Sequence, residues 1–137
     1  MSEPQVTILG HCTVPDMAKR PALKYPYAYV PAGTQGVQVI DVSTPVRPRL
    51  VDGAAWLPPG HPKCAQCEAV DWYQTWLMVA VGSQIYRLNC LPRGRLLWDR
   101  QSVIDLDQYV FGMTVEKVTG VMWVGTGYGV TVMSVRW

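Results

Sequence analysis

The fold of this chain is decided by the stretch Tyr27-Ala28-Tyr29-Val30-Pro31-Ala32-Gly33-Thr34-Gln35-Gly36-Val37-Gln38-Val39-Ile40-Asp41-Val42. It consists of an apolar segment, a short turn that contains two glycines, and a second segment in which apolar residues recur at every other position. This pattern is typical of a β-hairpin. We therefore predict an antiparallel pair of strands over residues 27–42.

The same hairpin pattern occurs twice more, over residues 76–88 and residues 121–135. Val37, Ile85 and Val130 hold equivalent positions in the three copies, which follow one another at intervals of 48 and 45 residues. A repeat of this length in an all-β chain is typical of a β-propeller, in which each blade is a four-stranded antiparallel sheet.

A fourth, outer strand is predicted after the first two hairpins, over residues 48–53 and 95–99. The sequence ends at Trp137, before a fourth strand of the third repeat. However, residues 4–10 match residues 48–53 in their proline, their apolar centre and their closing glycine. We therefore expect residues 4–10 to act as the missing strand, written first instead of last.

The chain is thus predicted to be a single all-β domain over residues 1–137. Its parts are a closing strand (residues 4–10), blade one (17–56), blade two (66–100) and blade three (109–137). Three blades are too few to close a ring, because propellers have about four to eight. We expect two copies to form a closed six-bladed homodimer, in which the N-terminal strand of each subunit completes the third blade of the other. The alternative is an open stack of three blades covered by another protein.

The first repeat resembles the LVIVD-repeat family of bacterial and archaeal β-propellers. The residues that carry the resemblance are 27–30, 36–45 and 48–51. The second and third repeats depart from the family pattern, which implies a propeller scaffold and assigns no chemistry to it. Within the matching part, Asp41 and Ser43 are predicted to hold a turn by accepting hydrogen bonds from nearby backbone N–H groups.

Composition excludes several classes of function. The chain is 49% hydrophobic and 16% charged, so it is expected to fold around a core. The net charge of +2 gives no reason to expect a nucleic-acid partner. No apolar run reaches the length of a membrane span, and Met1 is not followed by a signal-peptide pattern. We therefore expect no membrane contact and a cytoplasmic or particle-associated location.

Cysteine spacing suggests one candidate metal site. Cys64 and Cys67 form a Cys-x-x-Cys pair with the spacing of a zinc knuckle, and His61 lies three residues upstream. Cys12 completes the favoured set of zinc ligands, with His11 and Cys90 as further candidates for the fourth position. Because no signal peptide is visible, the default expectation is free reduced thiols and no cofactor; zinc is one alternative, and a disulfide between Cys64 and Cys67, strained in so small a loop, is the other.

Catalysis has little support in the sequence. There are two histidines, and no Gly-x-Ser-x-Gly nucleophile motif occurs. The glycine-rich run over residues 125–129 lies inside a hairpin, so we read it as a turn and not as a phosphate loop. Asp99, Asp105 and Asp107 are interpreted as solvated charges in one connection between strands. We predict that the chain is not an enzyme.

The six tryptophans and seven tyrosines give two remaining hypotheses. The favoured one is a non-enzymatic structural or protein-interaction propeller, a subunit of a larger assembly such as a phage or other virion component. The alternative is a lectin-like propeller that binds a glycan or small ligand, with Trp56 as the exposed candidate and with Trp98 and Trp123 packed between blades. A second alternative is an interaction module stabilised by zinc.

The zinc hypothesis predicts that protein purified without a chelator carries metal, bound by Cys64 and Cys67 with His61 or Cys12. Elemental analysis of that protein measures the metal directly. The substitution Cys64→Ser should then lower the temperature of unfolding, because a structural metal contributes to folding free energy. Metal-free protein whose unfolding temperature is unchanged by Cys64→Ser would remove the hypothesis.

Overall fold

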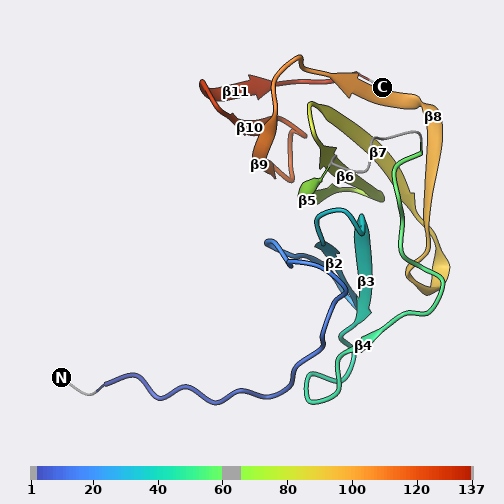
Figure 1. Cartoon of the computed structure of the whole chain (residues 1–137), viewed down its shortest axis with the longest axis vertical. Helices are drawn as coiled ribbons and strands as arrows, with labels where there is room; N and C mark the ends of the chain where they lie inside the picture. Colours follow the sequence, from blue (N-terminus) through green and yellow to red (C-terminus); the bar gives the residue numbers. More distant parts are fainter. Residues whose placement is uncertain (1–2, 60–65, 137) are drawn as a thin grey trace.

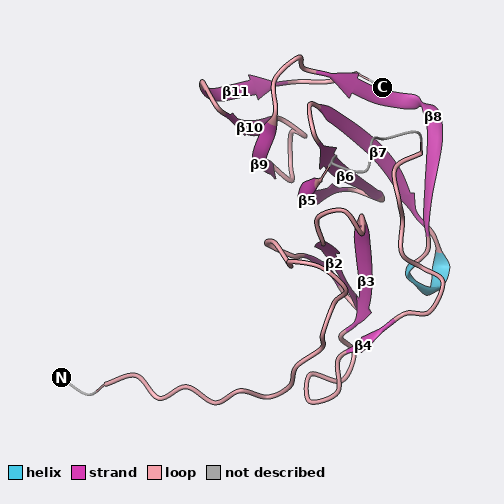
Figure 2. Ribbon diagram, viewed as in Figure 1, coloured by secondary structure: helices cyan, strands magenta, loops and turns pink. Residues whose placement is uncertain are grey.

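The computed structural model describes residues 3–59 and 66–136. Within these ranges the chain is all-β, as predicted, and the helical element present is a short 3-10 turn, Pro92–Gly94. The strands form three antiparallel sheets that follow one another along an arc (Figures 1 and 2). The described residues contain no helix that is both long and apolar enough to cross a membrane.

Each sheet contains one of the three predicted hairpins. The first sheet has the order β1 (Ala22–Lys24), β2 (Tyr27–Pro31), β3 (Val37–Asp41) and β4 (Arg49–Leu50). The second has the order β5 (Cys67–Tyr73), β6 (Trp76–Val81), β7 (Gln84–Cys90) and β8 (Leu96–Asp105). The third has β10 (Met122–Thr126) between β9 (Val110–Val115) and β11 (Gly129–Met133). The first two sheets are thus four-stranded and the third is three-stranded.

The turn of the first hairpin requires a glycine. Gly36 has a φ of +70°, which is a left-handed conformation that favours glycine. A Cβ atom there would lie 2.1 Å from the carbonyl oxygen of Trp56, because the connection after β4 passes directly over this turn. Val37 and Trp56 exchange backbone hydrogen bonds of 2.9 Å in both directions. The glycine therefore lets the connection pack against the start of β3.

The turn at the end of β3 forms with Asp41 as acceptor, as predicted, whereas Ser43 was predicted to accept and instead donates. The backbone N–H and the hydroxyl of Ser43 donate to Oδ1 of Asp41 at 2.9 and 2.7 Å. These bonds, the one from the Ser43 side chain first, hold the pKa of Asp41 below its ordinary value. Asp41 thus has a structural role in the turn.

The position of two aspartates differs from the sequence analysis. Asp99 and Asp105 were expected in a connection, but both lie inside β8, where Asp105 pairs with Gln84. A register shift between Tyr86 and Leu88 lets this long strand bend and remain paired with β7 past residue 100. Residues 4–10 form no strand pairing with the described part of their own chain, so their expected pairing with a second copy stays a prediction.

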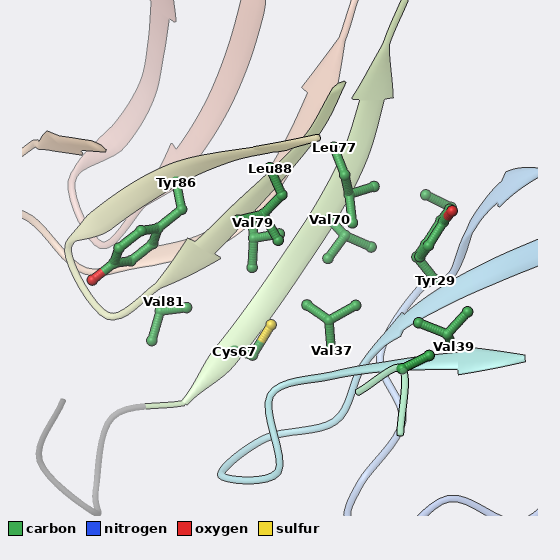
Figure 3. Close-up of a cluster of buried hydrophobic side chains, with 12 residues drawn as sticks. Tyr29, Val37, Val39, Cys67, Val70, Leu77, Val79, Val81, Tyr86 and Leu88 are labelled. Atoms are coloured by element: carbon green, nitrogen blue, oxygen red, sulfur yellow. The ribbon is translucent and has the colours of Figure 1, made fainter. Parts of the chain in front are cut away.

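The second sheet packs on the first through one face. Successive residues of a strand point to opposite faces, so Leu77, Val79 and Val81 of β6 share the face turned toward the first sheet. Tyr29, Val37 and Val39 meet them from β2 and β3 (Figure 3). All six side chains are at most 1% exposed. This joint is the larger part of the core.

The opposite face of the second sheet packs on the third. Met78 and Ala80 of β6 and Ile85 of β7 point this way, and each is at most 2% exposed. They contact the buried residues of the third sheet, namely Val110, Met113, Val115, Met122 and Val124. Because β6 is buried on both faces, its sequence is apolar throughout and does not alternate.

The first joint supplies a test of the core. Leu77→Ala should lower the free energy of unfolding by about 2–5 kcal/mol, because the leucine is completely buried and its removal leaves a cavity. Leu97→Ala is the matched control: Leu97 lies in β8 but is 53% exposed, so the change should stay within about 0.5 kcal/mol. Urea unfolding at one fixed protein concentration measures both. Equal effects of the two substitutions would contradict this assignment of the core.

Candidate functional site

The third sheet exposes a face that is buried in the other two. Residues directly opposite each other in an antiparallel ladder point to the same side. Trp123 pairs with Val132 and with Thr114, and Gly125 pairs with Val130 and with Gly112. These six residues form what we call the open face, whereas the alternate residues of the sheet contact the second sheet.

Exposure of the open face departs from the pattern of the repeat. Val37, Ile85 and Val130 hold equivalent places near the hairpin turns: Val37 lies in the last ladder pair before its turn, and Ile85 and Val130 lie in the pair before the last. Val37 and Ile85 are 0% exposed, because the next sheet covers them, whereas Val130 is 69% exposed. Trp123 and Val132 on the same face are 51% and 52% exposed. The third sheet thus carries a core-like surface with no sheet upon it in the described chain.

The edge of the third sheet is open as well. β3 lies between β2 and β4, and β7 lies between β6 and β8. β11 is the last strand of its sheet, with β10 as its strand neighbour in the described residues. An edge strand presents a row of backbone N–H and C=O groups that can pair with another strand. The open face and the open edge therefore meet at β11.

A hollow lies beside the open face. Gly112 and Gly125 face each other across β9 and β10, and a Cβ atom at Gly112 would meet nothing within 4 Å. The hollow has a volume of about 430 Å³. Its walls include Lys19, Arg20, Phe111, Trp123 and Val130. The small residues leave room for side chains from outside the sheet.

The N-terminal segment is the second exposed apolar feature. Val6, Ile8 and Leu9 are 85%, 84% and 61% exposed, and in Figure 1 the segment runs away from the three sheets. Further along the segment, Cys12 and Val14 pack on the first sheet, against its face that is turned away from the second sheet. Residues 3–10 therefore extend outward from a segment that is already held in place.

Asp16 anchors this segment to the first hairpin. Its carboxylate accepts hydrogen bonds from the backbone N–H of Thr34 at 3.1 Å and from the Thr34 hydroxyl at 2.9 Å. The pKa of Asp16 is lowered, first by the hydrogen bond from the Met17 N–H and then by those from Thr34. The segment thus leaves the first sheet in a defined direction.

Asp71 fixes the third sheet to the second. Its carboxylate accepts a hydrogen bond from the Val115 N–H at 2.7 Å and one from Nζ of Lys117 at 2.5 Å. Asp71 is 6% exposed, and charge-assisted bonds of this kind satisfy a buried carboxylate. Nζ of Lys117 also lies 4.5 Å from the centre of the Trp72 ring. These contacts hold β9 against β5 and so set the direction in which the open face points.

The predicted zinc ligands are only partly described. His61 and Cys64 lie outside the described residues. Cys67 contacts the face of the first sheet that carries Val37, whereas Cys12 contacts the opposite face, so the first sheet lies between them. Cys90 belongs to the same cluster as Cys67. No group of three or more potential metal ligands occurs among residues 3–59 and 66–136. The zinc site stays a prediction.

His11, the other candidate for the fourth ligand, lies in the N-terminal segment. Its Nε2 is 3.3 Å from the hydroxyl of Thr13. The described contacts of His11 are therefore local.

The aromatic candidates for a sugar site are arranged differently from the expectation. Trp56 was expected to be exposed, but it is half-buried and its ring centre lies 5.3 Å from that of Tyr86. Trp98 contacts the other side of Tyr86 at 5.1 Å, as expected for a residue packed within the core. Trp123 was expected to be packed, and it is half-exposed on the open face.

Comparison with known proteins adds little about function. No family model matches the chain, and no curated protein matches it in sequence. One similar solved structure is the crystal structure of the computationally designed Ika4 protein. It is 16% identical, covers 99% of this chain and 100% of its own, and superimposes with a TM-score of 0.47.

Cys67, one of the candidate zinc ligands, is buried in the core, and the reactivity of its thiol tests that position. Burial first, and the neighbouring Glu68 carboxylate second, raise the pKa of the Cys67 thiol to about 12. Because the thiolate is the reactive form, alkylation of Cys67 by iodoacetamide at pH 8 should be about a thousandfold slower in the folded protein than in urea-unfolded protein. Peptide mapping by mass spectrometry measures both rates. Similar rates in the two states would contradict the position of Cys67.

Proposed function

We propose that this chain is a non-enzymatic, self-assembling β-propeller subunit that serves as a structural or protein-interaction module. In this proposal each sheet is one blade, and two copies form a closed ring of six blades. The three antiparallel sheets, packed face to face, follow one another along an arc, and this arc supports the proposal because it would make up half of such a ring (Figure 1). Closed β-architectures remove the exposed sheet edges that otherwise lead to aggregation.

The observation that carries the proposal is the complementarity of the two ends of the arc. One end has a three-stranded sheet with an open face and an open edge at β11. The other end has residues 3–10, whose apolar side chains Val6, Ile8 and Leu9 are exposed. The third sheet has room for a fourth strand, which the N-terminal segment could supply. The exposed apolar side chains of that segment would in turn be covered by the third sheet.

Symmetry makes the two ends compatible. The N-terminal segment leaves at one end of the arc, and β11 lies at the other end (Figure 2). A half-turn about an axis through the open side of the arc brings the N-terminal segment of each copy to the third sheet of the other. Both contacts are then identical, as in twofold dimers generally. Within the described residues of one copy, the N-terminal segment runs away from the third sheet, so the two surfaces do not meet there (Figure 1).

The shifted carboxylates support a non-enzymatic function, since each of them has a structural role. Asp16 anchors the N-terminal segment and Asp41 holds a turn. Glu116 accepts hydrogen bonds from the backbone of Val118 and Thr119 in the turn before β10, and the Thr119 hydroxyl, followed by these N–H groups, lowers its pKa. The chemistry of these groups serves the fold and leaves the apolar surfaces as the means of interaction.

The proposal predicts a dimer that depends on the N-terminal segment. Sedimentation velocity of the intact chain should give twice the monomer mass. The double substitution Val6→Glu/Ile8→Glu should weaken association at least about 100-fold, because each side chain buried at a joint contributes about 1.5–3 kcal/mol and the dimer has two joints.

Val118→Glu is the matched control for this experiment. Val118 is also an exposed valine, 83% exposed, but it lies in the turn between β9 and β10 and takes no part in the strand pairing of β11. This variant should associate as the intact chain does. A monodisperse monomer for the intact chain would overturn the proposed function.

A further inference from the structure

We infer that the joint between two copies repeats the strand pairing of the sheets within the chain, with Thr7 of one copy opposite Met133 of the other and Ile8 opposite Val132. The inference rests on the proposed function and specifies its partner surfaces. The open face of the third sheet thereby receives the first sheet of a second copy, together with the N-terminal segment of that copy, and Trp123 lies at the centre of the contact.

The register follows from the two complete sheets. In the first, Ile40 of β3 pairs with Leu50 of β4; in the second, Leu88 of β7 pairs with Trp98 of β8. Ile40 and Leu88 lie three residues after Val37 and Ile85, and the residue at this distance from Val130 is Met133. The equivalent of Ile40 and Leu88 in the third sheet is therefore Met133.

The closing glycine supplies the other half of the register. Counted back from the closing glycines, Leu50 corresponds to Thr7; counted forward from the prolines Pro48 and Pro4, it corresponds to Val6. We take the count from the glycines, because it places Val6 and Ile8 on the open face. Thr7 therefore takes the place of Leu50, and Ile8 takes the place of Val51, whose N–H donates to the Val39 carbonyl at 2.9 Å. The equivalent acceptor on the third sheet is the carbonyl of Val132.

Side-chain alternation agrees with this register. Residues 5–8 alternate between polar and apolar, so Val6 and Ile8 point to one face and Gln5 and Thr7 to the other. With Ile8 opposite Val132, both apolar side chains lie on the open face, beside Trp123. A slip of one residue would turn Val6 and Ile8 away from the joint, which makes the register specific.

The connection after the strand is already in position. Ala54 and Trp56 follow β4 and pack in the joint between the first and second sheets, where Trp56 contacts Tyr86 of the second. Cys12 and Val14 likewise pack on the first sheet, against its face turned away from the second. The N-terminal segment thus lies on the first sheet as the later connection lies on the second. The packed residues Cys12 and Val14 are offset by one from His11 and Thr13, the equivalents of Ala54 and Trp56 in this register, so the two connections correspond as segments and not position by position.

The turn of the third hairpin has the matching space. Gly36 is followed by Val37, and Gly129 is followed by Val130, so the two glycines are equivalent. A Cβ atom at Gly36 would collide with the connection that carries Trp56, whereas one at Gly129 would meet nothing within 4 Å. The space over Gly129 is where the connection of a second copy would pass.

Cross-linking between two single-cysteine additions tests the register. Val39 and Val51 are joined by a backbone hydrogen bond, so the next pair along the ladder, Ile40 and Leu50, is a non-hydrogen-bonded pair. Met133 corresponds to Ile40 and Thr7 to Leu50, so Met133 and Thr7 are expected to form a non-hydrogen-bonded pair as well. The Cα atoms of such a pair are about 4.5 Å apart, within the range of a disulfide. Mixing Thr7→Cys protein with Met133→Cys protein under mild oxidation should therefore give a covalent dimer that contains one chain of each kind.

The matched control replaces Thr7→Cys by Ile8→Cys, mixed with the same Met133→Cys protein. In the inferred register these two positions point to opposite faces, so the yield of the mixed covalent dimer should fall at least about tenfold. Each variant oxidised alone measures the background from the natural cysteines, and mass spectrometry of the linked peptides identifies the joined positions.

A second variant tests the contact of the faces separately from the exchange of the strand. Trp123→Ala should weaken association at least about 100-fold, as for a buried aromatic anchor at the centre of an interface. An unchanged association constant for this variant would overturn the face contact.

The outcomes distinguish this inference from the proposed function. A dimer in which the Ile8→Cys mixture cross-links and the Thr7→Cys mixture does not would overturn the register and leave the proposed function intact. A chain that sediments as a monomer and forms no mixed cross-link would overturn both.

Discussion

Packing of apolar sheet faces against one another is the interaction on which the rest of the structure depends. The second sheet is covered on both sides, by Val37 and its neighbours on one side and by Val124 and its neighbours on the other. The outer sheets are each covered on one side by the second. Every face that the repeat makes apolar needs a neighbouring sheet, and a chain of three sheets leaves one such face without a neighbour at the third sheet.

The same constraint leaves apolar surface exposed at the two ends of the arc. Buried polar groups such as Asp71 connect one sheet to the next, and exposed carboxylates such as Asp16 and Glu116 hold loops and turns. Exposed apolar side chains occur on β10, on β11 and in the N-terminal segment, and others, such as Met17, Leu23 and Leu57, are exposed elsewhere. The apolar side chains of the open face and of the N-terminal segment are suited to contact with another protein surface.

The sequence predicted the fold more completely than it predicted the site. The three hairpins and the turn at Asp41 follow from local patterns, because glycines and alternating apolar residues specify a strand pair regardless of its surroundings. Of the candidate site, the sequence predicted that the third sheet needs a strand from elsewhere, but it did not predict the exposed face around Trp123. Exposure of Trp123 and burial of Trp56 depend on which sheet lies next to each of them, and Trp123 lies in a strand as regular as those of the core.

By itself, the sequence determined an all-β chain of three repeated hairpins, with apolar residues on the faces that pack. Only the tertiary structure decided that β6 is buried on both sides, that Cys12 and Cys67 lie on opposite faces of the first sheet, and that the equivalents Val37 and Val130 differ in exposure from 0% to 69%. The physical reason is that hairpin formation depends on neighbours in the chain, whereas burial depends on neighbours in space. Identical local patterns therefore become core in one repeat and surface in another.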